Sequence, residues 1–157
     1  MSDRNIRLLV TGGVLAAAIF LLTSFVRIPL PAGYLNLGDV GVFLAALLLP
    51  AGYAALCAGV GSALSDLIGF PLYMPVTFVV KGLTALVFSL LWHRLPGKLR
   101  YLAFLAVLTV PLGYFAFEIF VFAEYAWADL PMNLLQAAVG AGLALAIDRA
   151  TKGRFSV

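Results

Sequence analysis

The chain has 157 residues, of which 64% are hydrophobic and only 11% are charged. A soluble domain carries roughly 25% charged residues to cover its surface, so the composition excludes a soluble protein and predicts an integral membrane protein in contact with the lipid bilayer. The net charge of +3 is weak support for a nucleic-acid partner, and none is expected.

Six apolar runs predict transmembrane helices in chain order. The first starts at residue 8 and has no Ala-x-Ala cleavage site before a polar region, so we expect it to stay as a span. The second is the shortest against the roughly 20 residues that cross a bilayer, and Pro111 is expected to kink the fifth. The predicted fold is an all-α integral membrane protein, a compact six-helix bundle forming one domain over residues 1–157. The predicted ranges are 8–26, 37–49, 53–68, 75–92, 101–123 and 131–147.

Basic residues predict the orientation of this bundle. Cytoplasmic loops of membrane proteins carry an excess of Lys and Arg, and six spans with both termini in the cytoplasm leave only Arg27 on the outer side. We therefore expect cytoplasmic N- and C-termini. The residues then placed inside are Arg4, Arg7, Arg94, Lys98, Arg100, Arg149, Lys152 and Arg154.

The polar residues inside the predicted spans converge in the outer half of the bilayer. Lys81 lies about 9 Å below the outer end of the fourth helix, and Glu118 lies about 7 Å below the outer end of the fifth, at 1.5 Å per residue. An intramembrane charge indicates a functional site by default, so we expect an outward-facing cavity that binds a small molecule. The candidate substrate-binding residues are Asn36, Asp39, Tyr73, Lys81, Tyr114, Glu118, Asn133 and Gln136.

Each candidate also has a purely structural interpretation. Lys81 could extend to the outer surface, or Glu118 could be its ion-pair partner without any ligand. Asn133 and Gln136 could join helices by hydrogen bonds, and Asp39 could simply cap the second helix, which is its more favoured interpretation. Asp66 carries the same ambiguity at the end of the third helix.

The sequence contains no motif for catalysis or for metal binding. It lacks a phosphate-binding glycine loop, a His-Glu-x-x-His pattern and paired cysteines, so no catalytic residue, metal or cofactor is expected and the protein is not predicted to be an enzyme. A self-sufficient secondary carrier or small channel is the alternative, although a channel needs polar lining through its whole depth. An intramembrane enzyme is a third possibility.

Small residues on the first helix form two overlapping pairs four residues apart. The pairs are Gly12 with Ala16 and Gly13 with Ala17. Such stripes allow two helices to approach closely in lipid, so these four residues are the candidate docking surface for a partner protein.

Three motifs resemble the substrate-specific S component of energy-coupling factor (ECF) transporters. They are Asn36-Leu-Gly-Asp39 before the second helix, Ser65-Asp66-Leu67 at the end of the third, and Pro75-x-Thr77 followed by Lys81-Gly82 in the fourth. The resemblance is best over residues 33–86, while the length and the six predicted helices fit the whole chain.

This resemblance implies the binding subunit of an ATP-driven micronutrient importer in a prokaryotic cell membrane. Its implied partners are a transmembrane T component, docked on the small-residue stripe of the first helix, and two cytosolic ATPases that hydrolyse the ATP. Lys81, Glu118, Asn133 and Tyr114 favour a small aromatic vitamin or precursor. We expect a pyridine or pyrimidine such as vitamin B6 or hydroxymethylpyrimidine, and riboflavin next.

Overall fold

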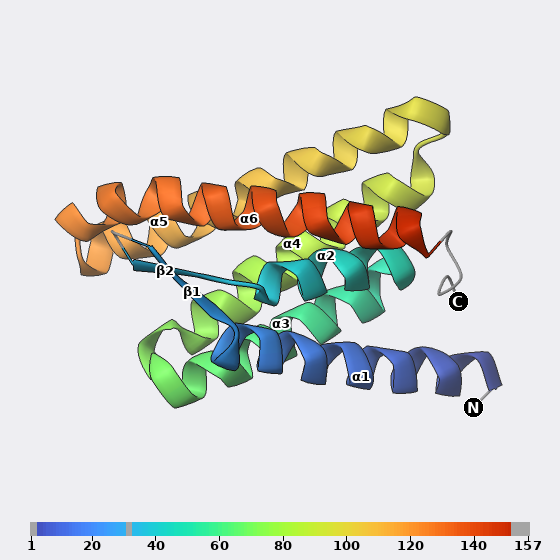
Figure 1. Cartoon of the computed structure of the whole chain (residues 1–157), viewed down its shortest axis with the longest axis horizontal. Helices are drawn as coiled ribbons and strands as arrows, with labels where there is room; N and C mark the ends of the chain where they lie inside the picture. Colours follow the sequence, from blue (N-terminus) through green and yellow to red (C-terminus); the bar gives the residue numbers. More distant parts are fainter. Residues whose placement is uncertain (1–2, 31–32, 152–157) are drawn as a thin grey trace.

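The computed structural model describes residues 3–30 and 33–151, and this part of the chain is almost entirely helical (Figure 1). Its elements are α1 (Asp3–Phe25), β1 (Arg27–Leu30), β2 (Gly33–Asn36), α2 (Gly38–Leu48), α3 (Ala51–Gly69), the 3₁₀ helix η1 (Pro71–Tyr73), α4 (Met74–Arg94), the 3₁₀ helix η2 (Gly97–Leu108), α5 (Thr109–Val121) and α6 (Glu124–Ala150). The predicted all-α class is confirmed.

Five helical stretches are long and apolar enough to cross a membrane. α2 has only 11 residues, or about 16 Å at 1.5 Å per residue, which is short of a bilayer core of about 30 Å. The sixth crossing therefore stays a prediction. The five stretches are Asp3–Phe25, Ala51–Gly69, Pro71–Arg94, Gly97–Val121 and Glu124–Ala150.

Several boundaries differ from the sequence prediction, and the first helix begins at Asp3 rather than at residue 8. The segment before α2 was expected to be a loop, but β1 and β2 form an antiparallel hairpin that pairs Ile28 with Leu35. The fifth helix has 3₁₀ geometry up to Leu108 and α geometry from Thr109. Pro111 lies in the first turn of the α-helical part and has no N–H to donate to Val107.

The sixth helix begins at Glu124, seven residues before the predicted start at Pro131. The predicted start at Pro131 relied on the frequent occurrence of proline in the first turn of a helix. Here Pro131 lies inside α6, and membrane helices tolerate an internal proline because neighbouring groups satisfy the freed carbonyl.

Small residues fill the interior of the bundle and large apolar side chains cover its outside. α3 packs so closely on α1 that a Cβ at Gly61 would lie 2.5 Å from the backbone oxygen of Ala16. By contrast Phe120 is 90% exposed and Phe25 is 71% exposed. This distribution suits a lipid surrounding, in which small residues let helices approach and large ones face the acyl chains.

The connections separate into two ends of the bundle. The β1–β2 hairpin, the α3–α4 connection and the α5–α6 turn lie at one end, and the start of α1, the α4–η2 connection and the end of α6 lie at the other (Figure 1). The second end carries most of the basic residues. Of the eight predicted on one side, Lys152 and Arg154 lie outside the described residues, and Arg149 donates a hydrogen bond of 3.0 Å to the Tyr101 hydroxyl.

Candidate ligand-binding pocket

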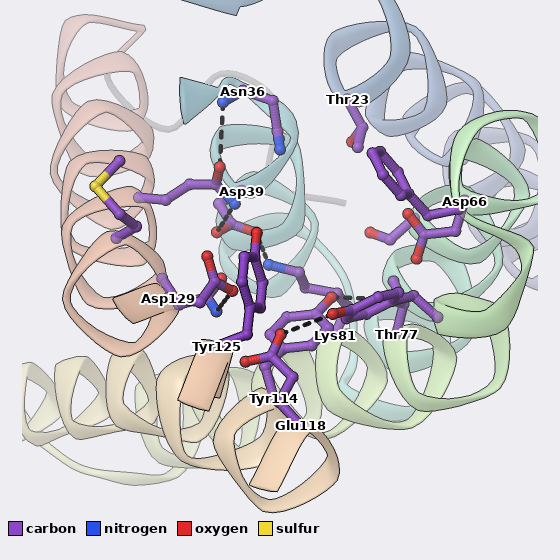
Figure 2. A pocket seen from close by; sticks show the side chains of 16 residues that line it. Thr23, Asn36, Asp39, Asp66, Thr77, Lys81, Tyr114, Glu118, Tyr125 and Asp129 are labelled. Carbon is purple, nitrogen blue, oxygen red and sulfur yellow. Dashed lines mark hydrogen bonds and ion pairs between the residues drawn. The ribbon is translucent and has the colours of Figure 1, made fainter. Parts of the chain in front are cut away.

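A cavity of about 200 Å³ lies toward the hairpin end of the bundle, and Figure 2 shows its lining side chains. All eight candidate substrate-binding residues lie on its wall, together with eight that the prediction did not include. The complete lining is Thr23, Asn36, Asp39, Ser62, Asp66, Phe70, Tyr73, Thr77, Lys81, Tyr114, Glu118, Tyr125, Asp129, Met132, Asn133 and Gln136.

Lys81 of α4 is paired with Asp39 of α2 rather than with Glu118 as expected. Its Nζ donates to Asp39 Oδ1 at 2.5 Å, and both side chains are buried, with exposures of 6% and 2%. The other oxygen, Oδ2, accepts a hydrogen bond of 3.3 Å from Gln136 Nε2 of α6. Because a buried charge is stable only when it is paired and hydrogen-bonded, this triad fixes three helices around the pocket.

The expectation that Asp39 caps the second helix is also wrong. The residue at the cap position is Leu37, whose side chain makes no capping hydrogen bond, and Asp39 lies in the first turn. Its carboxylate is directed sideways into the bundle, where Lys81 binds it. Its position near the start of α2 still suits a carboxylate, since the helix dipole is positive there.

A close contact between α2 and α6 holds Asp39 in place. A Cβ at Gly140 would lie 2.6 Å from Asp39 Cβ and 2.9 Å from its carbonyl carbon, so only glycine fits there without movement of the backbone. Asn36 adds a second link, because its backbone N–H donates to Gln136 Oε1 at 3.1 Å. Its side chain folds back to accept from Gly38 N at 2.9 Å.

Glu118 of α5 faces the pocket from the opposite wall. Its Oε1 accepts a hydrogen bond of 3.1 Å from the Tyr73 hydroxyl. Its Oε2 is buried and has no partner of regular hydrogen-bond geometry among the described residues. The residue as a whole is only 1% exposed, so water cannot easily supply the missing hydrogen bond. Figure 2 shows one Glu118 oxygen on a dashed line and the other without one.

Tyr114 joins the two walls. Its hydroxyl shares a hydrogen bond of 2.9 Å with Thr77 Oγ1 of α4, and Lys81 Nζ lies 5.4 Å from the centre of its ring. A cation over an aromatic face is attracted by the ring electrons. Tyr114 therefore presents a buried aromatic surface beside both the lysine and the carboxylate of Glu118.

The lining of α6 forms one stripe that the sequence prediction cut short. Asn133 donates to Asp129 Oδ2 at 2.6 Å, and residues 125, 129, 132 and 136 follow the i, i+4, i+7, i+11 spacing of one helix face. Because the sixth helix was predicted to begin at Pro131, Asp129 and Tyr125 were not recognised as part of this helix face. On α4, Thr77 precedes Lys81 by one turn, so the same spacing argument would have found it.

A second, more open hollow of about 670 Å³ adjoins the first. It is lined by Phe70, Tyr73, Phe122, Glu124 and Tyr125, three of which also line the polar pocket. Tyr73 stacks on Phe122 with ring centroids 6.2 Å apart and planes 13° apart. The polar pocket thus opens beside an aromatic surface.

The arrangement is suited to binding a polar molecule with a flat ring. It offers one ammonium, several carboxylates, hydroxyls, amides and aromatic faces on rigid helices. Among residues 3–30 and 33–151, no three His, Cys, Asp or Glu side chains come together in a way that could hold a metal ion.

The four candidate docking residues of α1 divide between two faces. Gly12 is buried, with Leu49 Cδ1 3.9 Å from where its Cβ would be, and Ala16 packs against Gly61. Gly13 and Ala17 are exposed, and nothing lies within 4 Å of a Cβ at Gly13. Only the second pair is accessible to a partner.

Part of the chain is similar to a protein of Pyrococcus woesei described as "Uncharacterized protein in gap 3'region". The two are 46% identical over 67 residues, which is 41% of this chain and 45% of that protein. The match therefore spans less than half of this relative's length.

A family model matches almost the entire chain, over residues 3–152, and its description is "ECF-type riboflavin transporter, S component". The apolar spans fit a multi-pass membrane protein of this kind. The resemblance found in the sequence motifs is thereby confirmed, and the chain belongs to the family of ECF-type riboflavin transporter S components.

Proposed function

We propose that this protein is the substrate-binding subunit of an ATP-driven importer and that its pocket captures riboflavin. The observation that carries the proposal is the family match over residues 3–152. The family name favours riboflavin over the pyridine and pyrimidine ligands that were our first expectation.

The two adjoining hollows support a ligand of this shape. The polar pocket of about 200 Å³ is smaller than the 300–1,000 Å³ typical of sites for drug-sized ligands, so it can take only part of a tricyclic flavin. The aromatic hollow of about 670 Å³ provides room for the remainder. In this arrangement the polar edge of the ring system enters between Lys81 and Glu118, and its apolar edge lies toward Phe70 and Phe122.

A single-ring pyridine or pyrimidine is the second candidate ligand. The small volume of the polar pocket favours it, since such a ring fits there without using the aromatic hollow. The two candidates are separated by measuring the binding of riboflavin, pyridoxine and hydroxymethylpyrimidine to the purified protein.

The orientation that we propose places the basic end of the bundle in the cytoplasm, in accordance with the positive-inside rule. Both termini are then cytoplasmic, and α2 completes a sixth, partial crossing. The pocket end faces outward, where an importer receives its ligand.

Transport requires an energy source outside the described chain, and we propose a T component and two cytosolic ATPases as partners. The protein alone should bind riboflavin, detected by quenching of flavin fluorescence, but should move none into liposomes until those subunits and ATP are present. Gradient-driven uptake by the protein alone would instead support the alternative of a self-sufficient carrier.

We propose Gly13 and Ala17 as the contact with the T component. Ala17→Leu should abolish ATP-driven uptake in the assembled complex while riboflavin binding stays within about twofold, because the side chain points away from the bundle. Val14→Leu, at a neighbouring exposed position, is the matched control and should retain uptake. Full uptake by Ala17→Leu would exclude this face as the docking surface.

A further inference from the structure

We propose that Glu118 Oε2 is a specificity-determining acceptor, which binds an N–H group on the edge of the ligand's ring. This inference rests on the proposed function and deepens it. It names the atom of the pocket that is reserved for the ligand and the chemical feature that the ligand must present.

The first argument is that almost every other buried polar group of the pocket already has a partner. Asp39 accepts from Lys81 and Gln136, Thr77 pairs with Tyr114, and Asn133 donates to Asp129. Of the side-chain atoms on the pocket wall, Glu118 Oε2 is the one that is fully buried with no hydrogen-bond partner in the described part of the chain.

The second argument is energetic. A buried acceptor without a donor destabilises the folded protein, and more so if it is charged. Tyr73 satisfies Oε1 only. The carboxyl group of Asp129 is close enough to interact with Glu118, but two carboxylates repel each other and can be joined only by a shared proton, so Asp129 is a poor partner for Oε2. Such a cost persists at a functional site when a ligand removes it on binding.

The third argument is the charge of the pocket as a whole. Four carboxylates lie on its wall and one ammonium, that of Lys81, faces them. The ammonium is already bound to one of the carboxylates. The surplus of negative charge favours a ligand that donates hydrogen bonds over an anionic one. The carboxylates belong to Asp39, Asp66, Glu118 and Asp129.

Riboflavin carries such a donor, the imide N3–H of its pyrimidine-dione ring. This N–H lies on the polar edge, opposite the apolar dimethylbenzene edge. With N3–H on Glu118 Oε2, the apolar edge lies toward the aromatic hollow that shares Tyr73 with the pocket. A pyrimidine with a ring amino group would offer the same donor.

The test compares riboflavin with 3-methylriboflavin, in which the N3–H is replaced by a methyl group. Wild-type protein should bind the methylated flavin at least tenfold more weakly, and Glu118→Gln should bind riboflavin at least tenfold more weakly. In Glu118→Gln the remaining oxygen accepts from Tyr73 and the amide NH2, which only donates, takes the place of Oε2, so the two flavins should differ by less than threefold. Asp3→Asn, which changes an exposed acid at the start of α1 at the opposite end of the bundle, is the matched control and should behave as wild type.

Melting temperatures without ligand provide a readout that is independent of which ligand binds. If Oε2 is reserved for a ligand, Glu118→Gln removes an uncompensated buried charge and should melt at or above the wild-type temperature. A lower melting temperature would show that the carboxylate serves the fold, and it would overturn the inference, as would an equal methylation penalty in both proteins. Wild-type protein that binds no riboflavin, alongside a more stable Glu118→Gln, would overturn riboflavin as ligand and retain the role of Glu118.

Discussion

The same two helices, α2 and α4, meet through different chemistry at the two ends of the bundle. Toward the hairpin end, Asp39 of α2 binds Lys81 of α4. One turn further along α2 and two turns along α4, Phe43 meets Phe88 with ring centroids 5.2 Å apart and planes at 67°. The aromatic contact continues through Trp92 and Phe104.

This difference shows how a small membrane protein can separate binding from stability. Aromatic rings interlock without needing polar partners, so the second end can stabilise the helices whether or not a ligand is present. The polar end is closely matched in donors and acceptors, and it has one acceptor left over. We therefore expect substitutions at the polar end to alter ligand binding, and substitutions at the aromatic end to alter stability alone.

Lys81→Met should have the largest effect, because it acts on both properties. It leaves the Asp39 carboxylate buried without its cation, and breaking a buried ion pair costs about 3–5 kcal/mol. Riboflavin binding should also be lost. Thermal unfolding in detergent and flavin fluorescence measure the two effects.

The double variant Asp39→Leu/Lys81→Met is the control for this prediction. Replacing both partners of a buried pair with apolar side chains is often neutral, so most of the stability should return while binding does not. Recovery of binding in the double variant would contradict a ligand role for this pair.

Phe88→Ala should have the next largest effect, confined to stability. The side chain is 1% exposed and contacts three aromatic rings, and truncating such a residue costs about 3 kcal/mol or more. The folded fraction should bind riboflavin with wild-type affinity, as measured after removal of aggregated protein. A tenfold loss of affinity would show that the two ends are not independent.

Ser89→Ala should have the smallest effect. Ser89 Oγ donates to the Leu49 carbonyl at 2.9 Å, and hydrogen bonds between membrane helices contribute about 0.6 kcal/mol on average. We expect a slight fall in melting temperature and unchanged binding. A large loss of stability would mean that this end also depends on polar contacts.

The position of the pocket could be predicted from the sequence because charged and amide side chains are rare inside membrane spans. Lys81 and Glu118 stand out in apolar runs, and counting 1.5 Å per residue placed both at a similar depth. The eight candidate residues predicted from the sequence all lie on the wall of one cavity.

The pairing of those residues could not be predicted in the same way. Depth does not reveal which helices are neighbours, so Glu118 was the expected partner of Lys81 while Asp39 was expected to cap the second helix. The hairpin was missed because Pro29 and Pro31 were taken only as residues that end the first helix. Asp129 was missed because Pro131 was taken as the start of a helix that begins at Glu124.

The contact between Gly140 and Asp39 has a consequence for how new ligand preferences could arise in this scaffold. Because Gly140 of α6 packs directly on the backbone of Asp39, this side of the pocket cannot accommodate a larger side chain at position 140 without movement of the backbone. Glu118, Tyr125 and Asp129 line the pocket from α5 and the first turns of α6, away from this contact. Directed evolution toward other vitamins should therefore succeed by varying these three positions while Asp39, Lys81 and Gly140 are left as they are.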